Sequence, residues 1–187
     1  QNENSASGLC SCLKQKLLDI AYNKSNISNL DKENFDTFRP EVFSDKVEPE
    51  KYKINVSPRQ YMLSLKSKCL DFIENFDNPE THNLLFTGNT GLGKTFLSSC
   101  IANEVLKLNK SVLYQTAPIM LDKLIDLKFG RESDIDEFYN KIYNVDLLII
   151  DDLGTEAMNN YKMSELFNII NSRLLNSENI IKKTIIS

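Results

Sequence analysis

The chain lacks tryptophan, has one histidine and only four arginines, and contains no apolar run that approaches 18 residues. The absence of a long apolar run argues against a transmembrane helix, and the chain shows no secretory or lipidation signature. We therefore expect a cytoplasmic protein with no membrane partner. So few arginines also disfavour a small-molecule kinase, because phosphoryl-transfer sites usually gather several cations around the transferred group.

Charge and size set further bounds. A formal net charge of −4 argues against a broadly basic surface, so any contact with DNA must come from a local cluster or from several subunits together. With 187 residues, 41% of them hydrophobic, the chain can bury one sizeable core, and we expect one main domain. Four cysteines in a cytoplasmic setting are expected to be reduced thiols or metal ligands.

The chain does contain a complete phosphate-binding loop, G-x-x-x-x-G-K-T, directly after the apolar run 83–87. In such a loop the glycines let backbone N–H groups turn toward phosphates, the lysine reaches the β- and γ-phosphate oxygens, and the threonine hydroxyl ligates Mg²⁺. A helix is expected to follow and to add its positive N-terminal dipole end. The predicted ATP-binding residues are Gly88, Asn89, Thr90, Gly91, Leu92, Gly93, Lys94 and Thr95.

A second motif ends in two acids. Residues 145–152 form a continuous apolar run, too short for a typical helix, that closes with Asp151 and Asp152, which predicts a buried parallel strand. Ligands of open α/β sheets collect at the carboxyl ends of strands, so both carboxylates are expected beside the phosphate-binding loop. In this Walker B arrangement Asp151 would hold Mg²⁺ through water, and Asp152 would orient or deprotonate the attacking water.

The residues around these motifs carry a finer resemblance. Four segments contribute to it: 83–88, 91–95, 114–117 and 148–156. Together they resemble the DnaC/DnaI helicase-loader group of bacterial AAA+ ATPases, over about residues 10–187. The transposition helper ATPase related to IstB shares both motifs and the fold, so the motifs separate these two groups poorly.

The resemblance implies an ATPase that engages the hexameric replicative DNA helicase and assists its placement on single-stranded DNA in replication initiation. It also implies self-association that depends on ATP. Asp152 is one methylene shorter than the glutamate common at this position in other AAA+ branches, so slow hydrolysis is expected without DNA or a partner. Two alternatives stay open: the IstB-like helper, and a nucleotide-gated binding module with little turnover.

The order of predicted elements indicates the fold class. Strands alternate with helices, which predicts a three-layer α/β P-loop domain whose parallel sheet has helices on both faces. A capping box with proline at N1 begins one helix at Ser57. Another helix, Asn160–Leu175, is expected to bury Met163, Leu166, Phe167, Ile170 and Leu174. Strands are predicted at 83–87, 111–115, 145–151 and 183–187, and a further helix at about Ser133–Tyr143.

Three segments are predicted along the chain: an N-terminal tail and helix at 1–25, an extended arm at 26–56, and the AAA+ core at 57–187, which we expect to be truncated at its C-terminus. The resemblance places a sensor residue and an arginine beyond Ser187. In the arm, Phe35, Phe38, Phe43 and Tyr52 are expected mainly to bury the arm against the core, and Phe35, Phe38 or Arg39 are candidates to touch adenine.

Cys10 and Cys12 form half of a possible four-ligand zinc site. The residues alone fit two ordinary thiols at a helix start better, since the one histidine, His82, is distant in sequence and is expected at the surface. The resemblance favours Zn²⁺ in the intact protein, because related loaders carry a small zinc module ahead of the ATPase core. Cys69 and Cys100 fall on inner helix faces and are expected to pack.

Four basic residues have two interpretations each. Lys123, Lys128 and Arg131 lie in the helical segments between the second and third strands, which the initiator and loader branch places near a central pore, so they are candidate DNA contacts. The alternative is a solvated basic edge. Arg173 either pairs across a subunit interface or favours the C-terminus of its own helix.

Overall fold

The computed structural model describes residues 32–129, 135–155, 157, 159–175 and 181–187. Within these ranges the strands form one parallel sheet in the order β1-β4-β3-β2. No helix there is both long and apolar enough to cross a bilayer. The strands are β1 (Leu84–Leu85), β2 (Val112–Thr116), β3 (Leu147–Asp151) and β4 (Lys183–Ile186).

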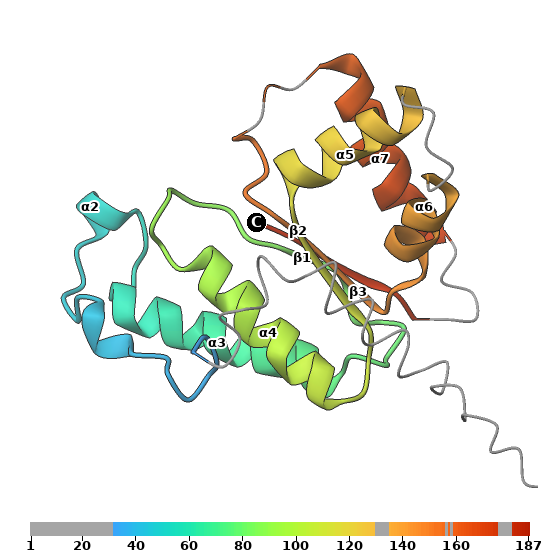
Figure 1. The fold of residues 1–187 in the computed structure, drawn as a ribbon. Helices are drawn as coiled ribbons and strands as arrows, with labels where there is room; N and C mark the ends of the chain where they lie inside the picture. The colour runs from blue at the N-terminus through green and yellow to red at the C-terminus, as the bar shows by residue number, and fades with distance from the viewer. Residues whose placement is uncertain (1–31, 130–134, 156, 158, 176–180) are drawn as a thin grey trace, which may run out of the picture.

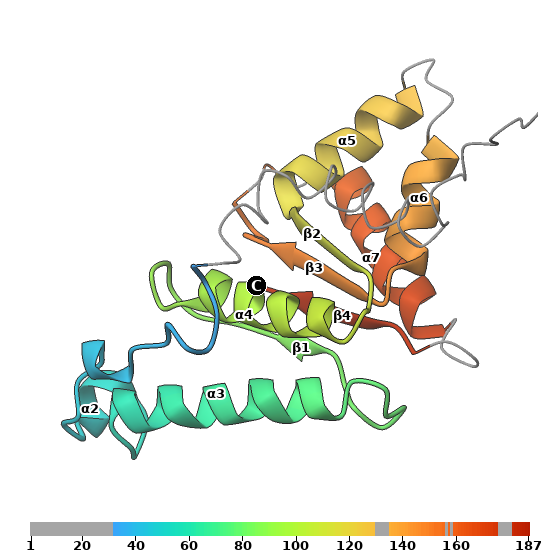
Figure 2. The same cartoon turned by 60° about the horizontal axis from the view of Figure 1, so that its bottom comes forward.

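Helices cover both faces of this sheet, which confirms the predicted three-layer fold class (Figures 1 and 2). Successive strand residues point to opposite faces, so β2, β3 and β4 each contribute to two hydrophobic clusters, one on either face of the sheet. Tyr114 and Ile149 belong to the cluster on one face of the sheet, whereas Leu113 and Leu148 belong to the cluster on the other face. On one side lie α3 (Pro58–Glu74) and α4 (Lys94–Lys107), and on the other α5 (Ala117–Phe129), α6 (Ile135–Asn144) and α7 (Asn160–Leu175).

The capping box predicted at Ser57 is present at the start of α3. The Ser57 hydroxyl accepts a hydrogen bond from the Gln60 backbone N–H at 3.2 Å, and the Gln60 side chain accepts one from the Ser57 N–H at 3.2 Å. Pro58 occupies the first turn, where its missing N–H costs nothing. These local bonds fix where α3 begins, and its buried residues Cys69 and Phe72 then reach the core.

The arm preceding α3 is folded back on the core by aromatic residues. Phe35 is 8% exposed, and Phe38 packs on Phe96 of α4 with ring centroids 6.3 Å apart. The Lys66 ammonium donates a hydrogen bond to the Phe35 carbonyl at 3.0 Å. The segment also contains a short 3₁₀ helix, η2 (Pro40–Val42), and a short helix, α2 (Pro49–Tyr52), so it is not wholly extended.

The bounds predicted for α7 are confirmed, and Leu166 and Ile170 pack inward as predicted, but the other three predicted buried residues do not. Met163, Phe167 and Leu174 are exposed by 54%, 64% and 51%. In their place the helix buries Ile169 and charged residues that have partners inside the molecule. Charged residues can be buried when they have partners inside the protein. The spacing of apolar residues does not show those partners, so it can assign the wrong face of a helix to the core. The buried charged residues are Lys162, Glu165 and Arg173.

Arg173 corresponds to neither of its two predicted roles. It is 1% exposed and joins the end of α6 to the beginnings of β3 and β4. Its guanidinium donates to the carbonyls of Ile142 and Lys183, each at 2.7 Å, and of Val145 at 3.0 Å, and its Nε donates to Thr184 Oγ1 at 3.0 Å. Burial lowers the pKa of Arg173 to about 10, which still leaves it charged at neutral pH.

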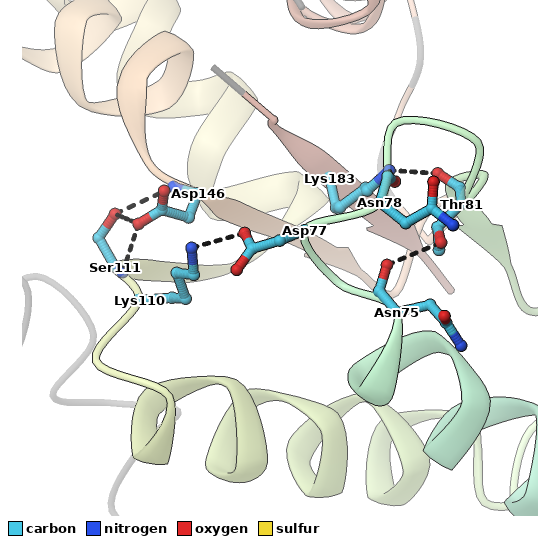
Figure 3. A network of polar contacts seen from close by, with 8 residues as sticks. All are labelled: Asn75, Asp77, Asn78, Thr81, Lys110, Ser111, Asp146 and Lys183. Atoms are coloured by element: carbon cyan, nitrogen blue, oxygen red, sulfur yellow. Dashed lines mark hydrogen bonds and ion pairs between the residues drawn. The ribbon is translucent and has the colours of Figure 1, made fainter. Parts of the chain in front are cut away.

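A separate polar network fastens the amino ends of the strands to the loop after α3 (Figure 3). The Lys110 ammonium pairs with Asp77 at 2.6 Å. Lys183, the first residue of β4, donates to the Asn78 carbonyl at 3.1 Å. These contacts lie at the amino ends of the strands. The phosphate-binding loop follows β1 and Asp151 ends β3, so both predicted motifs lie at the opposite, carboxyl ends.

We predict that Arg173→Met lowers the free energy of unfolding by about 3 kcal/mol, because several buried acceptors lose their donor while the side-chain volume is retained. Urea unfolding followed by circular dichroism measures this loss. Met163→Ala, on the exposed face of the same helix, is the matched control and is expected to change stability by less than about 0.5 kcal/mol. Equal stabilities for the two variants would contradict this role of Arg173.

Candidate functional site

The phosphate-binding loop runs from β1 into α4, and its backbone has the conformation that its glycines allow. Gly88 has φ 145°, and a Cβ built on it would lie 3.1 Å from Leu92 Cδ1. Gly93 has φ 88° and forms the N-cap of α4. Because L side chains rarely adopt this backbone region, the two glycines permit the sharp entry into the helix.

The N-terminus of α4 and the Lys94 side chain meet at this loop. The first turn of a helix has N–H groups without intrahelical acceptors. In α4 the helical hydrogen bonding begins with the Leu97 N–H, which donates to the Gly93 carbonyl at 3.0 Å. The Lys94 ammonium donates to the carbonyls of Gly88 at 3.0 Å and Asn89 at 3.2 Å. Helical N–H groups and an ammonium around one loop form a site suited to phosphate.

Thr95 and Asp151 come together as the two motifs predict. The Thr95 hydroxyl, in the first turn of α4, donates to Asp151 Oδ1 at 3.3 Å across 56 positions of sequence. Asp151 is the last residue of β3 and is 2% exposed. A hydroxyl and a carboxylate at this spacing are hard oxygen donors beside a phosphate site, and this donor set fits Mg²⁺.

Two further residues hold Asp151, and both were missed from the sequence. The Tyr114 hydroxyl donates to Asp151 Oδ2 at 2.6 Å, and the Ser187 hydroxyl also bonds the carboxylate. Burial, and then the bond to Asp151, raise the pKa of Tyr114, so its hydroxyl remains a donor. Tyr114 could have been predicted from the alternation of side chains along a strand, because it lies on the same sheet face as Asp151 in the neighbouring strand.

Asp152 is exposed and has a backbone conformation that is uncommon for its residue type. Its φ is 56°, in the left-handed region. The Thr155 hydroxyl donates to the Asp152 carbonyl at 2.9 Å, and the Asp152 N–H donates to Asp151 Oδ1 at 3.0 Å. A non-glycine residue held in this conformation often marks a functional position. The two acids thus occupy different environments, one buried and bonded and the other open to solvent.

A pocket of about 580 Å³ opens beside the loop, between the arm, α3 and β1. Its walls are mostly aromatic and aliphatic, and Lys94 reaches it from α4. The arm contributes Phe43 and Tyr52, whereas the candidate adenine contacts Phe35, Phe38 and Arg39 do not line it. An apolar pocket with one cation from the phosphate site is suited to the base and sugar of a nucleotide. Other lining residues include Ile54, Tyr61, Met62, Leu65, Phe86 and Leu92.

The cysteine predictions have different outcomes. Cys69 and Cys100 are buried, and burial raises the pKa of each thiol to about 12, so they pack as uncharged thiols, as predicted. Cys10 and Cys12 lie outside the described residues. Within the described ranges no three histidine, cysteine, aspartate or glutamate side chains gather as metal ligands would. His82 is exposed, as predicted.

The candidate DNA contacts that the structure describes have partners within the chain. The Lys128 ammonium lies 3.4 Å from Glu165 and 4.5 Å from the centre of the Tyr161 ring. The Lys123 ammonium lies 4.7 Å from the centre of the Phe138 ring. Lys128 is exposed, as the alternative of a solvated basic edge expects, whereas Lys123 is half-buried, and contact of either residue with DNA stays a prediction. Arg131 lies outside the described residues.

Comparison with known proteins places this site in a family. The chain belongs to the family described as the bacterial DnaA ATPase domain, whose model matches residues 70–185. This match, together with the sheet and its two motifs, defines a P-loop ATPase domain of the AAA+ type and confirms the predicted class.

Individual relatives agree with the resemblance predicted from the motifs. The chain is 31% identical over 107 residues to the replicative helicase loader DnaC of Escherichia coli K12, covering 57% of this chain and 43% of the relative. A protein of insertion sequence IS1162 from Pseudomonas fluorescens is 33% identical over 98 residues, covering 50% and 40%. The chain thus spans less than half the length of these curated relatives.

The crystal structure of a DnaC helicase loader has the same fold. It superposes with a TM-score of 0.65 at 23% sequence identity, over 85% of this chain and 77% of that one. At this identity the likeness concerns the fold alone.

We predict that Lys94→Ala abolishes tight ATP binding, because the loop loses the ammonium that donates to the Gly88 and Asn89 carbonyls and that would reach the phosphates. Fluorescence titration with a labelled ATP analogue measures the affinity, and we expect a loss of about 100-fold or more. Lys123→Ala, in α5, is the control and should bind as the parent does. Unchanged affinity in Lys94→Ala would refute the site.

Proposed function

We propose that this chain contains the ATPase core of a replicative helicase loader. In this role the protein engages the hexameric replicative DNA helicase and assists its placement on single-stranded DNA, under the control of ATP binding. One observation carries the proposal: Lys94, Thr95 and Asp151 lie together, as a phosphate and metal site requires, in a chain that is 31% identical over 107 residues to a helicase loader. A protein with this role works in the cytoplasm.

ATP would bind with its base in the pocket beside the arm and its phosphates at the N-terminus of α4. Lys94 then exchanges its bonds to the loop carbonyls for bonds to phosphate oxygens. Thr95 and Asp151 are the residues that would hold Mg²⁺, which neutralises phosphate charge when bound. The buried Asp151 is held by several donors, so little reorganisation is needed on binding.

Asp152 is the residue that we propose orients or deprotonates the attacking water. It is exposed at the carboxyl edge, next to the residue that holds the metal. Its short side chain leaves a longer reach to a water at the γ-phosphate than glutamate would. Hydrolysis is therefore slow until DNA, the helicase or a second copy of the chain completes the site.

DNA contact is proposed to arise in an assembly and to be weak for one chain. The formal net charge is −4, and Lys128 is already paired with Glu165. Attraction for a phosphate backbone grows with the number of cations presented together. Self-association in the presence of ATP would supply that number by repeating the cations of each chain along the strand.

The insertion-sequence relative supports a second candidate, a transposition helper ATPase. It matches this chain at 33% identity over nearly the same extent as the helicase loader does. In this alternative the partner is a transposase and the DNA is a duplex. Nucleotide binding is common to both candidates, so the partner distinguishes them.

We predict that Asp152→Asn leaves ATP affinity near that of the parent but lowers turnover by about 100-fold or more, because the amide cannot accept the water's proton. Phosphate release under saturating ATP measures the rate, and the fluorescence titration measures binding. Asp136→Asn, an exposed acid on α6, is the control and should hydrolyse ATP at the parent rate. Parent-level turnover in Asp152→Asn would remove this residue from the proposed role.

We also predict a stoichiometric complex, sensitive to ATP, between the full-length protein and the replicative helicase of the same organism. Light scattering with and without ATP gives the mass of the complex. The Lys94→Ala protein should show no response to ATP. If the parent protein binds ATP but forms no complex in either state, the transposition helper becomes the better candidate.

A further inference from the structure

We propose that Tyr114 is a positioning residue of the metal site, which orients the Asp151 carboxylate and links it to the helix that follows the phosphate-binding loop. The inference rests on the proposed function, because it concerns how the chain would hold Mg²⁺ with ATP. Neither the phosphate-loop motif nor the paired acids includes this residue.

The geometry gives each carboxylate oxygen of Asp151 a different set of partners. Oδ1 accepts from the Thr95 hydroxyl at 3.3 Å, from the Asp152 N–H at 3.0 Å and from the Ser187 hydroxyl, whereas Oδ2 accepts from the Tyr114 hydroxyl at 2.6 Å. The phenol thus occupies one oxygen and keeps the other turned toward Thr95. Rotation of the carboxylate would break this bond, which lies in a dry interior because Tyr114 and Asp151 are each 2% exposed.

Tyr114 is itself held by α4. Ser99 lies one turn after Thr95 on that helix, is 2% exposed, and hydrogen-bonds the Tyr114 hydroxyl. The helix therefore contacts Asp151 by two routes, directly through Thr95 and indirectly through Ser99 and Tyr114. Partners that orient a metal ligand in this way typically contribute about 10- to 100-fold to metal affinity.

The strand register places the phenol where it can act. Tyr114 pairs with Ile149 in the parallel ladder, so Asp151 lies one side-chain repeat further along the same sheet face. The ring packs in the cluster between the sheet and α4, with Ile149 and Ile101 among its members. Phenylalanine would keep this packing and remove only the hydroxyl, so the role can be tested without a cavity.

The test is a Mg²⁺ titration of the binding of a fluorescent ATP analogue, with affinity also measured in EDTA. In Tyr114→Phe the Mg²⁺ concentration at half-effect should rise about 10- to 100-fold, while affinity in EDTA should equal that of the parent. Ser99→Ala should shift the midpoint in the same direction by less. Tyr139→Phe is the matched control, because it removes a hydroxyl that donates to Glu165 at 2.7 Å on the opposite face of the sheet.

Each outcome has one meaning. If the parent fails to bind the analogue under any condition, the proposed function is wrong. If the parent binds and Tyr114→Phe has the parent's Mg²⁺ midpoint, the role of Tyr114 is overturned. An equal loss in EDTA and in Mg²⁺ would indicate a structural effect and would also overturn it. Should Tyr114→Phe not fold, Ser99→Ala decides by the same titration.

Discussion

The buried carboxylate of Asp151 is the charge around which the carboxyl edge of the sheet is arranged. A carboxylate removed from water is costly unless donors surround it, and here the donors come from α4, β2, the residue after β4, and its own chain neighbour. Each donor belongs to a different element, so those elements must all be in place before the charge is accommodated. The fold and the site therefore depend on the same bonds.

The opposite edge uses another buried charge for a structural purpose. Arg173 donates to backbone carbonyls at the start of β3 and in β4, and to the end of α6. A guanidinium offers several donors in one plane and can serve acceptors from three elements together. With the loop after α3 fastened to the same edge (Figure 3), the amino ends of the strands are fixed by polar bonds while their middles are packed by apolar side chains.

Much of this arrangement could be predicted from local patterns. The capping box at Ser57, the short apolar strands and the phosphate-binding loop each have a local physical cause, and they lie where the sequence indicates. The pairing of Thr95 with Asp151 could also be predicted, because parallel strands bring their carboxyl ends together.

What could not be predicted are the contacts formed between distant parts of the chain. Which face of α7 is buried depends on partners such as Asp122 for Lys162, 40 positions away and 2.7 Å distant. Periodicity assigns that face to Met163 and Phe167 because it counts apolar residues and cannot see ion pairs. Ser187 was missed for the same reason. A single serine after a strand forms no sequence motif, and its contact with Asp151 depends on which strands are neighbours in the sheet.

The clamp made by Arg173 also has a consequence for local fluctuations. The last turn of a helix usually frays, so its amide protons exchange with solvent faster than those of the core. Here the last turn of α7 cannot open without withdrawing a buried guanidinium from acceptors on three elements. Amide exchange there should follow the opening of the whole sheet, and helix and sheet should unfold as one cooperative unit.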